Sequence, residues 1–342
     1  MTGKNDLMKT ESFSLRRFLT GWEMILVYIL IGLNIALMLL ENDIYFTRGT
    51  IPFVIRSGMP VSIMVLGMTF VLMLGCIDIS VGSIMTVSCI VTGLVYGSGA
   101  GSALAILCGI LAGGVCGAFN GVLTAKLKMP SVIVTIATSM LFRGIAELVL
   151  RGEAVDTFPS FFAALAWHDL FDAVPYSMII FLAFAVIFGI VLEKTRFGRR
   201  VRMIGYSPTT AQYSGIRTDA VRIAVFTIMG ITAALSGILY AGRLGGITSG
   251  MGKGTELQVI AIAVLGGVST SGGKGGIFGP VIAAFIMAFL SKTLDLIGVH
   301  ANIQKIITGV ILLLVVVIPA VSRYISENRH RTKNGEEKNA DA

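Results

Sequence analysis

Charged side chains are scarce in this chain. Asp, Glu, Lys and Arg make up only 13% of its 342 residues, against about 25% in soluble proteins, while 55% of the residues are hydrophobic. Residues 79–125 contain no charged side chain at all, and this run of 47 positions is long enough to cross a hydrocarbon core of roughly 30 Å twice. The shortage of charge therefore excludes a soluble enzyme and predicts an integral membrane protein.

Cysteine and histidine are also few, which argues against two further kinds of protein. The four cysteines lie within or beside apolar runs, where a thiol behaves as a small hydrophobic group. They are Cys76, Cys89, Cys108 and Cys116, and the three histidines are His168, His300 and His330. Neither set has the spacing of a disulfide framework or a zinc site. Since no nucleophile is paired with a base either, we expect neither a bound metal nor enzymatic activity in this chain alone.

Uncharged stretches of 17 or more residues, with one polar interruption allowed, predict ten membrane-spanning helices. They cover approximately residues 22–41, 57–75, 80–98, 102–124, 130–149, 174–193, 222–243, 256–271, 276–295 and 303–322. Some are short or interrupted. We therefore expect an all-α polytopic fold with an N-terminal segment 1–21, a membrane domain 22–322 and a polar tail 323–342.

The positions of the basic residues predict the orientation of these spans. With the N-terminus inside, the inside segments carry 19 of the 27 Lys and Arg residues and the outside segments carry five. The inside segments are 1–21, 125–129, 194–222, 272–275 and the tail after residue 322. Both termini are thus predicted to be cytoplasmic. The net charge of +8 follows from this asymmetry and does not require a nucleic-acid partner.

Two loops between predicted spans are long enough to have structure of their own. The outside loop 150–173 contains four acidic residues and several aromatic ones, which favours a position at the membrane interface. Its acidic residues are Glu153, Asp156, Asp169 and Asp172. In the inside loop 194–222, Ser207 suits a helix N-cap, Pro208 the first turn and Gly215 the left-handed position after the last turn. This pattern predicts a two-turn helix on the cytoplasmic side.

Glycine is abundant, at 41 of 342 residues. In the fourth span, four glycines recur at every fourth position and so share one helix face, where they allow a neighbouring helix to approach closely. They are Gly109, Gly113, Gly117 and Gly121. Such a glycine face is typical of two helices that pack together permanently. It is equally compatible with a helix interface that moves during a transport cycle.

The glycine-rich stretch 266–276 superficially resembles a phosphate-binding loop. That loop requires Gly where this chain has Val268, and Ser or Thr where it has Gly275. An apolar span, and not a strand, precedes the stretch. Its glycines are therefore predicted to break the membrane helix and reverse the chain, in the bundle interior or at its inner mouth.

Isolated polar residues within the spans allow two interpretations. Asp78 is the only acidic residue between Asp43 and Glu147, so it is either a proton or cation site or, with Ser80, a cap for the third span. Other polar side chains that can cap a helix, bond a neighbouring helix or line a path are Asn34, Ser83, Asn120 and Glu256.

Two charged pairs lie near the outer ends of spans. Arg143 and Glu147 are four residues apart, and Lys292 and Asp295 are three apart, so each pair can neutralise itself on one helix face. The alternative is that they form a polar vestibule for a hydroxylated solute.

Three segments resemble the permease subunits of bacterial ABC importers for monosaccharides, a family that includes the ribose, xylose, rhamnose and autoinducer-2 systems. The segments are 75–83, 204–216 and 254–279, they occur in the family's order, and the resemblance extends over residues 20–322. Cys76 and the pair Tyr206-Ser207 differ from the residues most often found there. These differences do not identify the sugar.

The resemblance implies a ten-span permease in the bacterial inner membrane that dimerises with a second copy or a paralogue. It implies an extracytoplasmic sugar-binding protein that delivers the solute, and a cytoplasmic ATPase subunit that uses ATP and Mg²⁺, while this chain binds no cofactor. The segment implied to contact the ATPase comprises Ser207, Pro208, Thr209, Thr210, Ala211, Gln212, Tyr213, Ser214 and Gly215. The main alternative is a proton-coupled secondary transporter that uses Asp78, and a third is a membrane scaffold without transport activity.

Overall fold

The computed structural model describes residues 21–40, 49–155, 158–170 and 174–300, together with part of 302–317. The predicted tail 323–342, nearly all of segment 1–21 and much of the tenth predicted span lie outside these residues. Asp156 and Asp172 of the outside loop lie outside them as well.

The described chain is mostly helical. The helices are α2 (Trp22–Leu40), α4 (Thr50–Met73), α5 (Val81–Gly97), α6 (Ser102–Lys126), α7 (Ser131–Leu150), α8 (Ser160–Trp167), α9 (Tyr176–Lys194), α10 (Arg196–Tyr206), α11 (Pro208–Tyr213), α12 (Thr218–Leu244), α13 (Thr255–Leu265) and α14 (Phe278–Leu296). Within the described residues, α4, α6, α7, α9, α12 and most of α14 are long and apolar enough to cross a membrane, whereas the apolar stretches in α2, α5 and α13 are shorter. The polytopic helical fold is confirmed, and ten spans remain a prediction.

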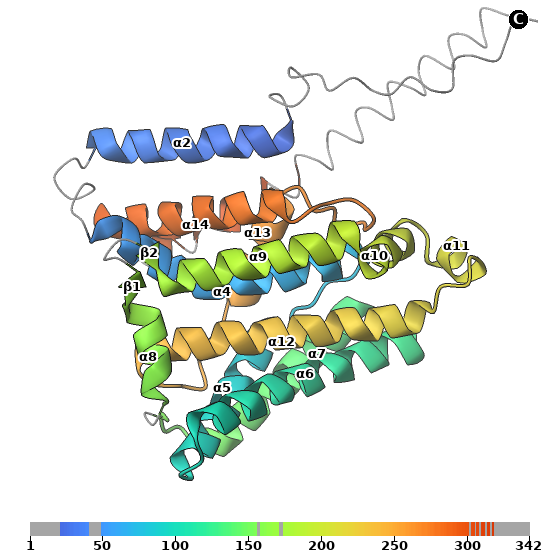
Figure 1. The fold of residues 1–342 in the computed structure, drawn as a ribbon, viewed down its shortest axis with the longest axis horizontal. Coiled ribbons are helices and arrows are strands. Elements are labelled where there is room, and N and C mark those ends of the chain that lie inside the picture. Colours follow the sequence, from blue (N-terminus) through green and yellow to red (C-terminus); the bar gives the residue numbers. More distant parts are fainter. Residues whose placement is uncertain are drawn as a thin grey trace, which may run out of the picture.

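The long helices run side by side, and the short elements α8, α10, α11 and a hairpin lie at the two ends of the bundle (Figure 1). Helices α10 and α11 lie at one end, called here the α11 end. Helix α8 and a small antiparallel hairpin of β1 (Asp169–Leu170) and β2 (Val174–Pro175) lie at the other, the α8 end. The hairpin is a departure from the all-α expectation, although each strand has only two residues.

Helix α4 forms the centre of the core. It packs against α9, α12, α13 and α14, and its residues from Met59 to Met73 are buried throughout. Met64, Leu66 and Phe70 have no exposed surface. A helix that is apolar on every side, as α4 is here, needs neighbours all round it.

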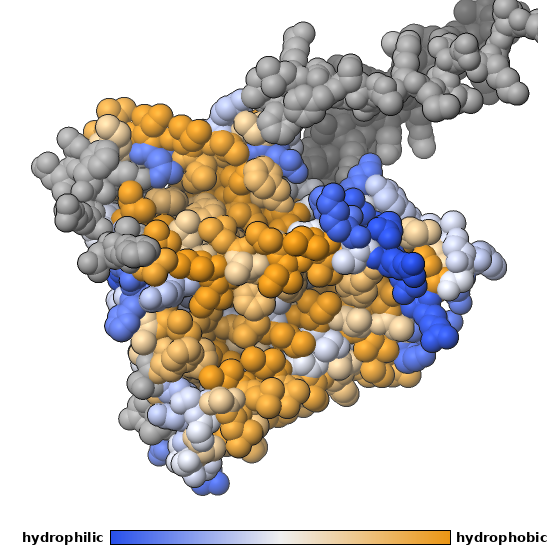
Figure 2. Space-filling model, viewed as in Figure 1, coloured by the Kyte–Doolittle hydropathy of each residue, from blue (hydrophilic) through white to orange (hydrophobic). Residues whose placement is uncertain are grey.

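The outer surface of the bundle carries a broad apolar band (Figure 2). Large exposed side chains on α6, α7 and α9 contribute to the apolar surface, among them Leu111, Leu148 and Val186. Strongly hydrophilic residues flank the band at the α11 end, and further polar ones lie at the α8 end. An apolar band between two polar ends is the surface that a lipid bilayer requires.

One of the expected ion pairs is replaced by contacts to the backbone. Arg143 makes no ion pair with Glu147 among the described residues, and instead donates hydrogen bonds to the carbonyl oxygens of Ser249 and Met251, at 2.8 and 2.9 Å. The prediction of a self-neutralising pair on α7 was therefore wrong, because the loop 245–254 between α12 and α13 lies against this helix. The side chain of Lys292, in the second expected pair, lies outside the described residues.

Candidate functional site

The short helix α11 is formed by the caps that the sequence predicted. The Ser207 hydroxyl accepts a hydrogen bond from the backbone N–H of Thr210 at 3.2 Å, and Pro208 occupies the first turn. Gly215 has a φ of +79°, and the N–H of Ile216 donates to the carbonyl oxygen of Ala211 at 3.1 Å. The prediction of a helix over this segment is confirmed.

Most of α11 is exposed. Only Ala211 is buried, at 1% exposure, whereas Tyr213 is 89% exposed. Among the described residues, helix α11 lies at one extreme of the bundle (Figure 1), and it presents mainly polar side chains beside this tyrosine. An exposed aromatic residue on a short, capped helix is a suitable contact surface for another protein.

Helix α10 holds α11 against the bundle and was not predicted from the sequence. Its buried side comprises Gly198, Val201 and Ile204, and the Thr195 hydroxyl caps it by accepting from the N–H of Gly198 at 3.3 Å. Arginines occupy its exposed side. This alternation has the spacing of an amphipathic helix, so hydrophobic periodicity could have identified α10.

Three glycines from distant parts of the chain meet where α10 ends. We call Gly75, Gly205 and Gly272 the glycine junction. A Cβ atom on Gly205 would collide with the backbone of Met73 and Gly273, and one on Gly272 would lie against Gly75 and Gly205. The N–H of Gly273 also donates to the carbonyl oxygen of Met73 at 2.9 Å.

The glycine junction joins three elements by direct backbone contact. Gly75 follows α4, Gly205 is the penultimate residue of α10, and Gly272 lies in the loop 266–277 that connects α13 to α14. Because backbone atoms cannot change rotamer, a displacement of α10 has to move the end of α4 or this loop. The loop therefore reverses the chain, as predicted, and also contacts the support of α11.

A buried polar network lies in the turn between α4 and α5. One carboxylate oxygen of Asp78 accepts from the N–H of Ser80 at 2.8 Å and from its hydroxyl at 2.6 Å. The amide of Asn120 in α6 donates to the same hydroxyl at 2.7 Å, and Ser83 donates to the carbonyl oxygen of Ser80. Asp78 thus stabilises the turn before α5, and Asn120 bonds a neighbouring segment. The second carboxylate oxygen of Asp78 and the side-chain oxygen of Asn120 are buried without a hydrogen-bond partner among the described residues.

The glycine face of α6 packs closely, as expected. Added Cβ atoms on Gly113 and Gly117 would collide with the backbone of α12 around Gly230, and one on Gly109 would meet α5. Gly121 likewise lies against α12 at Ile223. The prediction of close helix packing is confirmed.

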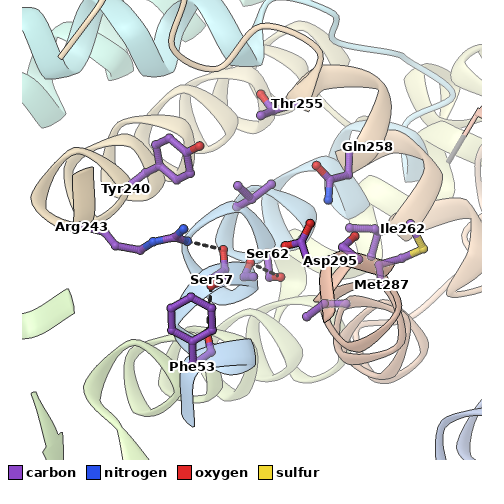
Figure 3. A pocket seen from close by; sticks show the side chains of 15 residues that line it. Phe53, Ser57, Ser62, Tyr240, Arg243, Thr255, Gln258, Ile262, Met287 and Asp295 are labelled. Carbon is purple, nitrogen blue, oxygen red and sulfur yellow. Dashed lines mark hydrogen bonds between the residues drawn. The ribbon is translucent and has the colours of Figure 1, made fainter. Parts of the chain in front are cut away.

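A cavity of about 260 Å³ lies between α4, α12, α13 and α14, towards the α8 end (Figure 3). Most of its polar lining consists of hydroxyl and amide groups. Its polar lining residues are Ser57, Ser62, Tyr240, Arg243, Thr255, Gln258, Ser291 and Asp295.

Comparison with known proteins decides what kind of molecule carries these features. Residues 50–316 match the family described as the permease component of the branched-chain amino acid transport system. The chain belongs to this permease family. It is 33% identical over 303 residues to the autoinducer 2 import system permease protein LsrC of Yersinia pseudotuberculosis serotype O:1b (strain IP 31758), covering 86% of this chain and 85% of the relative. It is 34% identical over 291 residues to the corresponding protein of Yersinia enterocolitica serotype O:8, covering 84% and 81%. No solved structure matches.

The permease is therefore a transmembrane subunit of an ABC importer and a multi-pass protein of the inner membrane. Importers of this kind work with an ATPase on a separate subunit and with a binding protein. Helix α11, the glycine junction and the cavity therefore belong to one subunit of a larger assembly.

The polar residues predicted to act as caps or path residues do not form one site in the permease. Asp78, Ser80, Ser83 and Asn120 come together. Glu256 lies across Gly82 from them, in the first turn of α13, where its carboxylate accepts from the N–H of Gly254 at 3.1 Å. Asn34 donates to the carbonyl oxygen of Leu30 within α2, a helix that packs mainly on α14.

Of the polar residues that line the cavity, only Asp295 was considered in the sequence as part of a solute site, while Thr255 and Gln258 lie in the segment 254–279 that carried the family resemblance. The others are single hydroxyl or amide residues, and each looks unremarkable on its own helix. Tyr240 and Arg243, three residues apart near the end of α12, were the available signal, because both lie on the same helix face. Their partners on α4, α13 and α14 could not be paired with them without the fold.

Proposed function

We propose that the permease imports a monosaccharide or a similar small polyhydroxylated solute that an extracytoplasmic binding protein delivers. The α11 end faces the cytoplasm, both termini lie on that side, and the chain crosses the membrane ten times. The relatives named as autoinducer 2 import permeases support this class of solute. The exposed arginines of α10 support the orientation, since basic residues concentrate on the cytoplasmic side.

The ATPase subunit binds α11 and the residues around it, Ser207 to Gly215. The observation that carries this proposal is the combination of an exposed α11 with a buried support, α10, that contacts the rest of the bundle through the glycine junction. Closure of the ATPase would displace α11 and shift the population of permease conformations through this contact. The functional assembly contains a second permease copy or a paralogue.

Co-purification of the ATPase tests this assignment. Thr209 in α11 and Thr248 in the loop after α12 are both exposed threonines, and they lie on different sides of the proposed membrane. We expect Thr209→Arg and Tyr213→Asp to reduce the amount of ATPase recovered with the permease, and Thr248→Arg to leave it unchanged. ATPase recovery that survives both changes in α11 would contradict docking at this helix.

The identity of the solute can be tested by measuring which compound the partner binding protein binds. Calorimetry of that protein against a panel of pentoses, hexoses, deoxy sugars and autoinducer 2 should identify one tight ligand, and ATP-dependent uptake should follow the same preference. Tight binding of a branched-chain amino acid and of none of these compounds would overturn the proposed solute class.

A further inference from the structure

The cavity near the α8 end contains polar groups that the protein itself leaves without hydrogen bonds. Among the described residues, nothing hydrogen-bonds to the hydroxyl groups of Tyr240 and Ser291 or to the side-chain amide of Gln258. They come from α12, α14 and α13, and Figure 3 shows Tyr240 and Gln258 around the same space. Polar groups at membrane depth normally find partners, so these three are positioned for a bound molecule or water.

The cavity lining contains one cationic side chain, Arg243, and one anionic side chain, Asp295. Arg243 donates to the carbonyl oxygen of Ser57 at 2.9 Å and its guanidinium lies 5.9 Å from the centre of the Tyr240 ring. Asp295 accepts a hydrogen bond from Gln304 at 2.6 Å. One cation and one anion, both engaged with the protein, surround a set of neutral hydroxyl and amide groups. This lining favours an uncharged solute with several hydroxyl groups over an ion.

The volume also limits the ligand. Pockets for drug-sized ligands measure about 300–1,000 Å³. At about 260 Å³, this cavity is smaller, so it fits a compact solute. Its walls include apolar side chains, Ile262 and Met287 among them, that can pack on the carbon face of such a molecule.

The cavity is closed towards the α11 end. Helices α4 and α13 enter from the outer side and α14 returns towards it, so Ser62, Ile262 and Ala284 are the deepest lining residues on these helices. Further along α4, Met64 and Leu66 are fully buried. Arg243 and Asp295, near the outer ends of α12 and α14, mark the outer part of the cavity. This is the geometry of a binding site accessible from the outside.

We propose that this cavity is a binding site for the imported solute within each permease chain, in which Tyr240, Gln258 and Ser291 hydrogen-bond the hydroxyl groups of a small uncharged polyhydroxylated molecule. The inference rests on the proposed import function and adds the residues that recognise the solute. Because α4, α13 and α14 run from the cavity to the glycine junction, motion of α10 changes the shape of the site.

Protection of an introduced thiol tests the site directly. The permease carrying Ser291→Cys is reconstituted in proteoliposomes with its ATPase and its binding protein, and is labelled from the outside with a membrane-impermeant maleimide. The labelling of the native cysteines, measured on the unsubstituted permease, is subtracted. The probes are the pentoses, hexoses, deoxy sugars and autoinducer 2 of the calorimetry panel, D-ribose among them. We expect the probe that the native assembly imports to slow labelling at least threefold. Labelling of the exposed residue in Ser98→Cys should not change.

Removal of single hydrogen-bonding groups tests the individual residues. Tyr240→Phe and Gln258→Leu keep the approximate size of each side chain, and each should raise the solute concentration that gives half-maximal protection about threefold to tenfold. Tyr28→Phe, at a half-exposed tyrosine of α2, is the matched control and should have no effect. Ser57→Cys replaces Ser291→Cys as the labelled position if that variant does not reach the membrane.

The outcomes separate this inference from the proposed function. If the native assembly imports a probe but the probe protects neither cysteine, or neither cysteine is labelled from outside, the cavity is not a solute site and the import function stands. Protection that Tyr240→Phe and Gln258→Leu leave unchanged overturns the assigned residues. If the native assembly, with ATP and its binding protein, imports no compound of that panel, the proposed solute class fails, and the inference fails with it.

Discussion

The two ends of α4 show opposite kinds of packing. Near the α8 end, α4 borders a polar cavity of about 260 Å³, whereas its other end meets α10 and the loop 266–277 at the glycine junction, where backbones touch. Space at one end leaves room for a solute, and the absence of space at the other forces neighbouring elements to move together. A permease driven by a separate ATPase subunit needs both a space for the solute and a rigid contact that transmits movement, and here α4 connects the two.

Adding the same group at each end gives the sharpest test of this comparison. Gly205→Ala and Ser57→Thr each add one methyl-sized group. At Gly205 the new carbon would collide with the backbone of Met73 and Gly273, while Ser57 lines the cavity. We expect Gly205→Ala to reduce uptake at least tenfold and Ser57→Thr to change it less than twofold, with the permease quantified in the membrane. Equal effects would mean that the two ends do not differ in packing.

The seam between α6 and α12 should respond to added volume through stability. Gly117→Val adds an isopropyl group whose Cβ alone would collide with the backbone of Phe226 and Gly230, and overpacking of this kind typically costs about 1–3 kcal/mol. The free energy of unfolding, measured by chemical denaturation in detergent, should fall by this amount. Gly144→Val, on the exposed side of α7 with no atom near the added carbon, controls for the helix propensity of valine. A similar loss in both variants would argue against close packing at this seam.

Loss of the α11 cap should have a smaller, local effect. Ser207→Ala removes the oxygen that accepts from Thr210, and loss of an N-cap costs about 0.5–2 kcal/mol. We expect the affinity for the ATPase, measured by titration against the purified subunit, to fall about twofold to tenfold, because α11 is folded for a smaller fraction of the time. Ser207→Asp can still accept the bond and should retain the affinity. If both variants bind equally weakly, the hydroxyl itself contacts the ATPase.

Substitution of Asp78 should have the smallest effect on transport. Asp78→Asn keeps an oxygen that can accept from the N–H and hydroxyl of Ser80, so the turn before α5 should persist. ATP-dependent uptake with the binding protein should stay within about twofold of the unsubstituted permease. Loss of uptake with normal membrane levels would revive the alternative of a proton-coupled site at Asp78.

Local sequence signals predicted local structure well. The caps of α11 and the glycine face of α6 depend on residues less than four turns apart, and both formed as expected. Arg143 was assigned to Glu147 by the same kind of local reasoning, and that assignment was wrong because two carbonyl oxygens from the loop 245–254 lie within hydrogen-bond distance. Spacing along a helix states which contacts are possible, and a competing partner from elsewhere in the chain decides between them.

The sequence by itself determined the class of protein, because apolar length and the position of charge specify a membrane domain without any knowledge of packing. It also determined the capped helix α11 and the chain reversal after α13, since both follow from the conformational preferences of Gly, Pro and Ser. Only the tertiary structure decided that Gly75, Gly205 and Gly272 touch, and that Tyr240, Gln258 and Ser291 surround one cavity. The three glycines are 67 to 197 positions apart in the chain, and the three cavity residues come from three separate helices. Contacts over such separations are set by how helices pack and not by any local preference.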